Sequence, residues 1–212
     1  SLGYFQKVTG IRFDLMDRLG IVQVRLITGG RAVLHFGDLT YSVVASAGRD
    51  TPLGLAASYR YLCKGLLAAF ASLGIEARLG SEKPSAPIPA SCFAVAAPGD
   101  ITCRGRKFVG SAQKRLGASL LQHGSILLRS QEKILAEIFA GKEKGESQAL
   151  LEKVTCLDDM LERRMELEEI SEALVSGFKT ALNVEFHPDK LSCEEETLAA
   201  SLAGKYGKHC KQ

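Results

Sequence analysis

The sequence contains a thiol and an amine in surroundings that favour nucleophilic and proton-transfer chemistry. Cys92 follows residues 80–91, which are rich in Ser, Pro and Ala and predict a loop in which a thiol is accessible. Lys107 stands among further cations, and no acidic residue occurs between Asp100 and Glu132. A cationic surrounding stabilises a thiolate and favours an amine that donates to a developing oxyanion. These two residues are therefore candidates for a nucleophile and its electrophilic partner.

Paired glycines and two histidines form a second group of candidates. Gly29-Gly30 allows backbone amides to approach a carbonyl or phosphate oxygen closely. His35 and His123 are candidates for the same pocket. Each feature also has a purely structural interpretation: a plain hairpin turn at the glycines, a solvated basic strand around Lys107, and a hydrogen-bonded core histidine at position 123. Cys92 in the same way could be an ordinary free thiol.

The elements that must position these residues change from strands to helices along the chain. Alternating apolar residues predict strands over 21–27, 31–36, 40–47, 75–79, 101–103, 106–110 and 120–128. Tight turns are predicted at Gly29-Gly30 and Arg104-Gly105. Capping and periodicity predict helices over 14–19 (Asp14 as N-cap), from Thr51-Pro52 to Gly74, and over 130–139, 166–182 and 192–206. The last of these begins with the capping box Ser192-x-x-Glu195. This order favours an α+β fold with a mixed or antiparallel sheet and flanking helices.

Composition excludes several classes of protein. Hydrophobic residues make up 46% and charged residues 24% of the 212 residues, which excludes a mainly disordered chain. No apolar run suits a membrane span, and the first residues lack a secretory signal, so we expect a cytoplasmic protein that does not bind membranes. The six cysteines form no CxxC pair, so we expect no metal site.

Charge is unevenly divided along the chain. Residues 1–129 carry a net charge of +9 and residues 130–212 a net charge of −6. The basic part predicts an acidic partner. Aromatic residues make up only 7% of the chain, which disfavours a nucleic-acid binder.

Five motifs, taken in order, resemble the lipoate–protein ligase and octanoyltransferase family over nearly the whole chain. They are Thr28–His35, Asp38–Ser42, Ser91–Phe93, Gly105–Gln113 and Gln122–Ser125. The resemblance implies the biotin/lipoate protein ligase fold, which is similar to that of class II synthetases. It further implies a catalytic domain over residues 1–140, with its N-terminal segment missing, and a small helical C-terminal part over 141–212 that packs on it.

The resemblance implies one of two reactions. An octanoyltransferase takes octanoate from octanoyl-acyl carrier protein through a Cys thioester, and passes it without a cofactor to a Lys of a lipoyl domain or glycine-cleavage H protein. A lipoate–protein ligase uses ATP and Mg²⁺ to form lipoyl-adenylate. Two features favour the transferase. One is the presence of Cys92, and the other is Arg31, which stands where common bacterial ligases tend to have a third Gly. The ligase, and a non-catalytic or partial subunit, remain open alternatives.

The resemblance also assigns roles to residues. Cys92 is the implied nucleophile and Lys107 the implied catalytic amine, whereas Cys103 is an alternative nucleophile four residues before Lys107. Arg25 precedes Leu26 at a place where the family often has paired arginines. The implied substrate-binding residues are Arg25, Thr28, Gly29, Gly30, Arg31, Ala32, His35, Gly110, Ser111, Ala112, His123 and Gly124.

Overall fold

One antiparallel sheet forms the centre of the protein. The structure, a computed structural model, describes residues 1–6, 11–80, 99–130, 132–139 and 152–207. The strands, in the spatial order β1-β5-β4-β3-β2, are β1 (Asp38–Ser46), β5 (Ser119–Leu127), β4 (Arg106–Leu116), β3 (Ile101–Cys103) and β2 (Ala77–Leu79). Each neighbouring pair is antiparallel. The predicted α+β class with an antiparallel sheet and flanking helices is confirmed.

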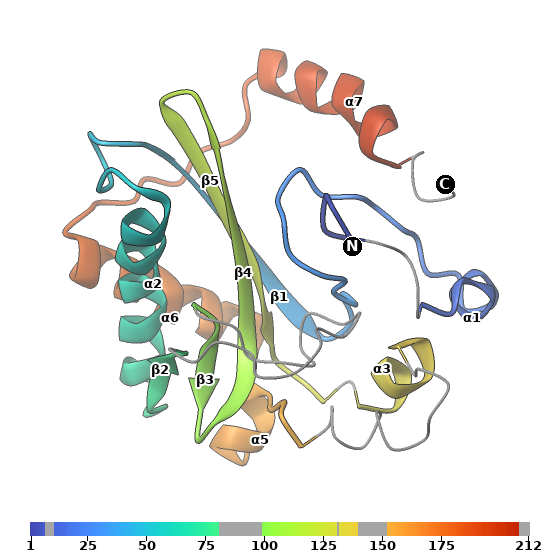
Figure 1. Ribbon diagram of the computed structural model, residues 1–212. Helices are drawn as coiled ribbons and strands as arrows, with labels where there is room; N and C mark the ends of the chain where they lie inside the picture. The colour runs from blue at the N-terminus through green and yellow to red at the C-terminus, as the bar shows by residue number, and fades with distance from the viewer. Residues whose placement is uncertain (7–10, 81–98, 131, 140–151, 208–212) are drawn as a thin grey trace.

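Two long helices cover one face of this sheet (Figure 1). They are α2 (Leu55–Ser72) and α6 (Leu167–Leu182), and the apolar side of α2 packs on the strands. The ring of Phe70 on α2 meets that of Phe108 on β4 edge to face, with centroids 4.8 Å apart. Side chains of α5 (Leu157–Leu161) and α6 enter the same core, in which Leu157 and Ile170 are fully buried. The predicted domain boundary at residue 140 stays a prediction.

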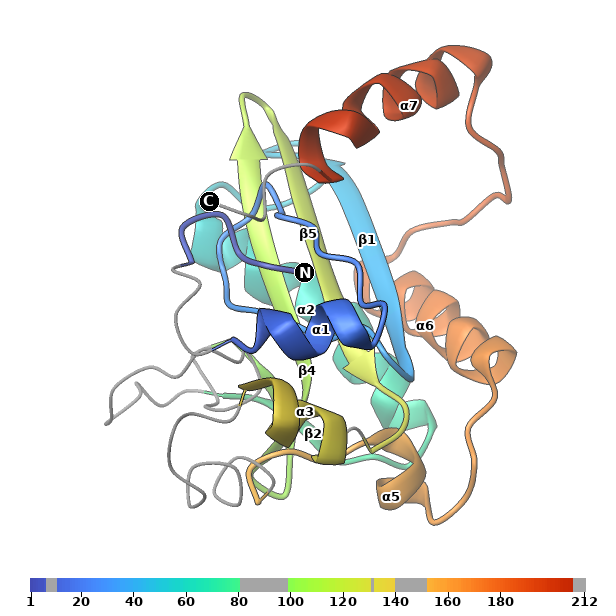
Figure 2. The same cartoon turned by 90° about the vertical axis from the view of Figure 1, so that its right-hand side faces the viewer.

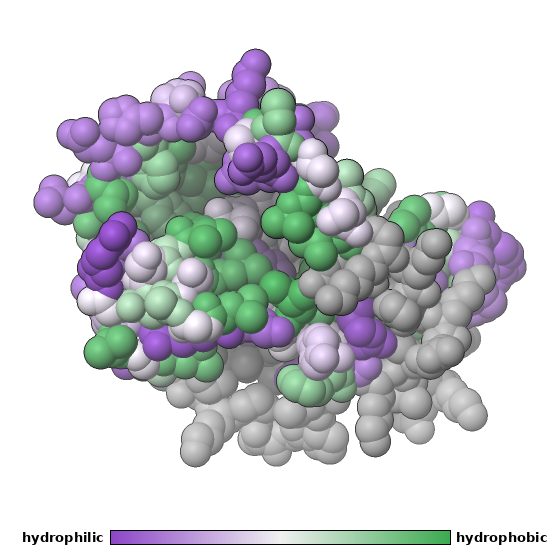
Figure 3. All heavy atoms as spheres, turned by 90° about the horizontal axis from the view of Figure 1, so that it is seen from above, coloured by the Kyte–Doolittle hydropathy of each residue, from purple (hydrophilic) through white to green (hydrophobic). Residues whose placement is uncertain are grey.

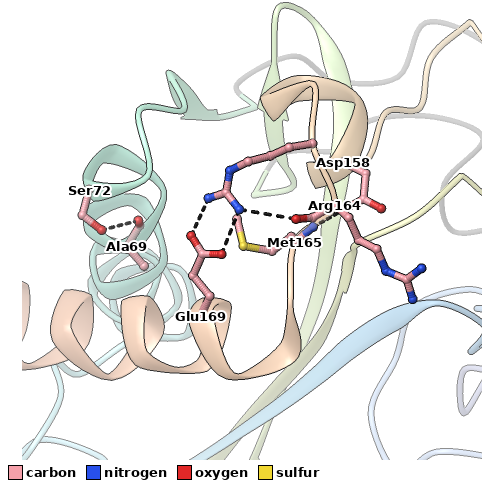
Figure 4. A network of polar contacts seen from close by, with 7 residues as sticks. Ala69, Ser72, Asp158, Arg164, Met165 and Glu169 are labelled. Carbon is pink, nitrogen blue, oxygen red and sulfur yellow. Dashed lines mark hydrogen bonds and ion pairs between the residues drawn. The ribbon is translucent and has the colours of Figure 1, made fainter.

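The turn that leads into α6 is held by polar contacts (Figure 4). The backbone N–H of Met165 donates to Asp158 Oδ1 at 2.7 Å, and the Met165 side chain is fully buried. The Arg163 guanidinium pairs with the Glu169 carboxylate in the first turn of α6. Together these contacts direct α6 onto α2.

The N-terminal part of the chain lies on the other face of the sheet (Figure 2). Here α1 (Phe13–Arg18) and α3 (Glu132–Phe139) enclose a small second core of Met16, Leu34, Leu135 and Ile138. Seen from above, apolar residues surround a hollow in the surface and hydrophilic residues border it (Figure 3).

The C-terminal helix is α7 (Cys193–Gly207). Within the described residues, no helix is long and apolar enough to cross a membrane. The cytoplasmic location stays a prediction.

The hairpin predicted from strands 21–27 and 31–36 is wrong. Residues 1–4 lie between its two arms: Leu2 N–H donates to Val24 O at 2.8 Å, and Val33 N–H donates to Ser1 O at 2.9 Å. Because each arm bonds to the N-terminal residues, the arms cannot pair with each other. Their alternation of apolar and polar residues reports a half-buried extended chain, which has the same period as a strand.

Two predicted N-caps are also wrong. Helix α2 begins at Leu55 with Gly54 as its N-cap, and the Thr51 hydroxyl instead donates to Ser46 O at 3.2 Å. Helix α1 has Arg12 as N-cap, and Asp14 lies inside its first turn. The pairing of Thr51 with the end of β1 uses the hydroxyl that the prediction assigned to the helix.

Other local predictions are confirmed. Arg104-Gly105 forms the tight turn between β3 and β4, with φ of 49° and 77°, which suits the twist of the two strands. At the start of α7, Ser192 N–H donates to Glu195 Oε2 at 2.7 Å, and Glu195 N–H donates to Ser192 Oγ at 3.3 Å. The predicted loop over 80–91 lies almost wholly in residues 81–98, which are outside the described residues.

A close crossing of α2 and α6 generates a test of this packing. A Cβ added at Gly177 would lie 2.5 Å from Ala69 N and 2.5 Å from Gly65 O, which are backbone atoms that cannot rotate away. We expect Gly177→Ala to lower the free energy of unfolding by about 1–3 kcal/mol, because the helices must separate. Ser176→Ala, on the exposed side of α6, is the control and should have little effect. Urea unfolding checks this, and stabilisation by Gly177→Ala would contradict the crossing.

Candidate active site

Lys107 is a buried lysine at the start of β4. Its side chain is 1% exposed, and its Nζ lies 2.8 Å from Asp100 Oδ2, whose side chain is 8% exposed. The backbone is held as well: Lys107 N–H donates to Lys153 O at 2.8 Å, and Thr155 N–H donates to Lys107 O at 3.0 Å. A buried ammonium requires a compensating charge, which Asp100 provides. The interpretation of Lys107 as part of a solvated basic strand is therefore wrong.

Asp100 was not among the predicted site residues. The sequence predicts cations around Lys107, and the structure adds this carboxylate, because the tight turn at Arg104-Gly105 brings the start of β4 back beside β3. A signal was present in the sequence. Asp100 is the last acid before a long stretch without acids, and it comes just before the β3–β4 hairpin that carries Lys107.

Strand pairing brings two of the predicted motifs together. In the register of β4 and β5, Gly110 lies opposite Ser125, Ser111 opposite Gly124, and Ala112 opposite His123. Alternate residues of a strand point to opposite faces, so each pair has its own face. The sheet thus separates the residues of the two motifs into two sets. The inner set is Ser111 and Gly124, and the outer set is Gly110, Ala112, His123 and Ser125.

The outer set faces the N-terminal part of the chain. Thr28 Oγ1 lies 2.7 Å from His123 Nε2, and the Thr28 side chain is fully buried. A Cβ placed on Gly30, where φ is +105°, would lie 4.0 Å from the Cβ of Ala112. The structure therefore brings Thr28, Gly30, Ala112 and His123 together on one side of the sheet. Burial, with a smaller effect of His35, lowers the pKa of His123, which favours the neutral imidazole.

The inner set faces α2. Ser111 Oγ accepts a hydrogen bond from the Tyr41 hydroxyl at 2.7 Å. A Cβ on Gly124 would lie 2.6 Å from Gly110 O and 2.7 Å from a Tyr41 ring carbon. Gly124 is therefore required by packing against Tyr41. The side chain of Ser111 and the bare face of Gly124 point away from His123, which separates them from the outer set.

His35 is positioned by a buried carboxylate. His35 Nδ1 lies 2.8 Å from Asp38 Oδ2, and this oxygen accepts a further hydrogen bond from Ser125 Oγ at 2.6 Å. Burial by itself would raise the pKa of Asp38, but the hydrogen bonds from His35 and Ser125 lower it below its ordinary value. Through His35 and Ser125, Asp38 therefore links the segment that follows Gly29-Gly30 to strand β5.

The remaining predicted residues lie in different places. Arg25 Nη1 donates to the carbonyl oxygens of Gly3, Tyr4 and Gln6 at 2.8, 3.3 and 3.2 Å, so its guanidinium holds the N-terminal residues.

Ala32 is buried beside Leu2, Arg31 is half-buried, and Gly29 is exposed. Cys103 is buried in the core that α2 covers. Cys92 lies outside the described residues.

The buried ion pair predicts a large loss of stability when one partner is removed. We expect Asp100→Ala to lower the free energy of unfolding by about 3–5 kcal/mol, because the Lys107 ammonium would stay buried without this carboxylate. Asp14→Ala, which removes an exposed carboxylate paired with Arg18, is the control and should cost much less. Denaturant unfolding at neutral pH measures both. Equal losses for the two variants would contradict a compensating role for Asp100.

The Asp38 carboxyl predicts a pH-dependent contribution to stability. Because its pKa is lowered in the folded protein, its contribution is complete above the unfolded pKa of about 3.9 and is lost as the pH falls through the folded pKa. We expect Asp38→Asn to destabilise the protein at pH 6 by more than it does at pH 3. Urea unfolding of both proteins at both pH values checks this. The same difference at the two pH values would contradict the lowered pKa.

Comparison with known proteins places this chain in a family. A family model described as the lipoyl protein ligase A/B catalytic domain matches residues 1–179. An octanoyltransferase LipM of Moorella thermoacetica is 39% identical over 217 residues, which are 97% of this chain and 79% of the relative. The octanoyltransferase LipM of Bacillus subtilis is 35% identical over 216 residues, which are 96% of this chain and 78% of the relative.

Solved structures of ligases share the fold. A lipoate-protein ligase A bound with ATP superposes with a TM-score of 0.81 at 28% identity, over 96% of this chain and 76% of that one. A T. acidophilum protein described as a lipoate protein ligase, with bound lipoic acid, gives a TM-score of 0.80 at 28% identity, with the same coverage. From the family model, the sequence identities and the shared fold, we conclude that this chain belongs to the lipoyl protein ligase A/B catalytic domain family.

Proposed function

We propose that the protein takes an octanoyl group from octanoyl-acyl carrier protein onto Cys92 and passes it to a lysine of a lipoyl domain or of glycine-cleavage H protein. The observation that carries this is the 34–39% identity to octanoyltransferases over at least 95% of the chain. The chain is accordingly an octanoyltransferase, an acyltransferase of lipoate biosynthesis. The donor, the thioester and the choice of acceptor are the proposed parts.

The proposed reaction has two steps. The Cys92 thiolate attacks the carbonyl carbon of the octanoyl thioester, and the carrier-protein thiolate leaves as the new thioester forms. The ε-amine of the acceptor lysine then attacks this thioester, an amide forms, the Cys92 thiolate is released and the amine loses a proton. A thioester keeps the acyl group activated, so we propose that neither ATP nor Mg²⁺ takes part.

Lys107 is the proposed electrophilic group in both steps. Each step passes through a tetrahedral intermediate whose oxygen carries a negative charge. A buried ammonium is a strong donor to such an oxygen, because little water screens it. The contact with Asp100 at 2.8 Å supports this role, since it holds the ammonium in one place before substrate binds.

The outer face of the sheet is the proposed substrate side. A pocket of about 330 Å³ lies beside His123, and the apolar residues Leu26, Ile27 and Leu121 contribute to its lining. Gly30 and Ala112, which lie against each other near His123, leave room for a ligand because neither has a long side chain. We assign the eight-carbon acyl chain to this side.

Partners with negative charge suit the first part of the chain. Residues 1–129 carry a net charge of +9, which would attract acidic carrier and acceptor domains. The family acts on lipoyl domains: one neighbour, at 25% identity and a TM-score of 0.80, is described as a bi-partite lipoate protein ligase and its E2 lipoyl domain from Thermoplasma acidophilum. Acyl carrier protein and glycine-cleavage H protein are partners only by proposal.

An ATP-dependent lipoate–protein ligase is the second candidate. A specific observation favours it, because a neighbour with a TM-score of 0.81 is a lipoate-protein ligase bound with ATP. This reaction would need ATP and Mg²⁺ and would form lipoyl-adenylate. It would not require a thiol at position 92.

Intact-protein mass spectrometry separates the candidates. We expect wild-type protein mixed with octanoyl-acyl carrier protein, without ATP, to gain one octanoyl group that hydroxylamine removes. Cys92→Ala should gain none, whereas Cys193→Ala, which removes an exposed free cysteine, should behave as wild type. An unmodified wild type that lipoylates a lipoyl domain only with lipoate, ATP and Mg²⁺ would support the ligase instead. Modification under neither condition would contradict both enzymatic candidates.

A further inference from the structure

Tyr59 reaches from the helix layer to the backbone on both sides of the buried ion pair. It lies on α2, and its hydroxyl donates to Gly99 O at 2.9 Å and lies 3.4 Å from Ser111 O. Gly99 directly precedes Asp100, and Ser111 lies on β4, four residues after Lys107. One hydroxyl thus connects the segment that carries the carboxylate to the strand that carries the ammonium.

The ring of Tyr59 lies directly against Gly99. A Cβ added at Gly99 would be 2.8 Å from Tyr59 Cε1, and φ at Gly99 is +97°, a conformation that L residues rarely adopt. A glycine here therefore permits both the turn and the close approach of the ring. Gly80 also holds this backbone, because Gly99 N–H donates to Gly80 O at 3.0 Å and Gly80 N–H donates to Asp100 O at 2.7 Å. Tyr59 is the side chain that adds a contact to Gly99 from the helix layer.

Hydrogen bonds beside Tyr59 hold β4 to α2. Ser58 Oγ donates to Gln113 Oε1 at 3.0 Å, and Gln113 Nε2 donates to Gln122 Oε1 at 3.1 Å. Gln122 Nε2 then donates to the Tyr41 hydroxyl at 3.2 Å, which donates to Ser111 Oγ at 2.7 Å. Of these residues Ser58 lies on α2, Gln122 on β5 and Tyr41 on β1, so the network ties Gln113 and Ser111 of β4 to α2 and to the neighbouring strands. Burial raises the pKa of Tyr59 well above its ordinary value, so its hydroxyl remains a donor at any working pH.

We propose that Tyr59 is a positioning residue for octanoyl transfer: through Gly99 it fixes the Asp100 carboxylate, and so the Lys107 ammonium, relative to β4. This inference rests on the proposed function of Lys107. Tyr59 lies on the α2 side of the sheet, away from Thr28 and His123, so it acts without touching the acyl group. The rate of octanoyl transfer falls when the position of the ammonium is less defined, because the ammonium must lie at one place to donate to the oxyanion.

Tyr59→Phe tests the proposal, with Tyr61→Phe as a matched control. Tyr61 lies on the same helix, and its hydroxyl donates to Leu182 O at 3.5 Å, away from the ion pair. We expect Tyr59→Phe to lower kcat for octanoyl transfer to a lipoyl domain by about 10- to 100-fold and to leave KM for that domain within a factor of about two. Tyr61→Phe should change neither constant. Gly99→Ala, which displaces the Tyr59 ring, should lower kcat as Tyr59→Phe does.

A second readout does not depend on activity. Acetylation by a water-soluble reagent that modifies amines, followed by peptide mass spectrometry, reports how often Lys107 is exposed, with the exposed Lys190 as internal reference. We expect Lys107 to be acetylated faster in Tyr59→Phe than in wild type, and at the wild-type rate in Tyr61→Phe. Thermal unfolding of both variants verifies that they are folded at the assay temperature.

The outcomes separate the two proposals. An active wild type in which Tyr59→Phe and Tyr61→Phe give the same kcat and the same Lys107 acetylation would overturn the role of Tyr59 and leave the proposed function intact. A rise in KM without a fall in kcat would also overturn it, since that indicates a binding role. A wild type that transfers no octanoyl group would refute the proposed function, and the acetylation rates alone would then decide whether Tyr59 positions Lys107.

Discussion

The ion pair between Lys107 and Asp100 is the constraint on which the rest of the site depends. Moving an ammonium and a carboxylate out of water costs several kcal/mol for each ion, and only close, well-directed contact offsets this. The tight turn at Arg104-Gly105 brings Lys107 opposite Thr102, two residues after Asp100, and the backbone of residues 153–155 bonds to that of Lys107. An arrangement this constrained presents a positive charge at a fixed place inside the protein, which is what stabilisation of an oxyanion requires.

The two faces of the sheet divide the work of the site. The face toward α2 carries packed rings and hydrogen-bonded amides, with Gln122 and Ser111 among its residues, and it fixes the strands. The other face carries His123 beside small residues, with Thr28 of the N-terminal part in contact with it, and it is the side to which we assign the acyl chain. Because successive residues of β4 and β5 alternate between these faces, one short motif supplies both structure and binding.

The sequence predicted the class of fold, the β3–β4 turn, the capping box at Ser192 and the motifs that meet at the site. These features depend on local patterns, so they can be read without the structure. It did not predict Asp100, the split of Ser111 and His123 between two faces, or the separation of the two arms at 21–27 and 31–36, which it paired as a hairpin. Those features depend on partners distant in the sequence, such as the N-terminal residues that lie between the arms of the predicted hairpin. Cys92 lies outside the described residues, so its role is still a prediction.

We propose that the Lys107 ammonium donates a hydrogen bond to the carbonyl oxygen of the bound acyl group. Infrared spectroscopy of the enzyme acylated with octanoate labelled with ¹³C at its carbonyl detects this hydrogen bond. We expect a thioester carbonyl band at lower frequency in the wild-type acyl-enzyme than in acylated Lys107→Met, because a hydrogen bond from an ammonium weakens the C=O bond. The same frequency in the two acyl-enzymes would show that Lys107 does not make this hydrogen bond.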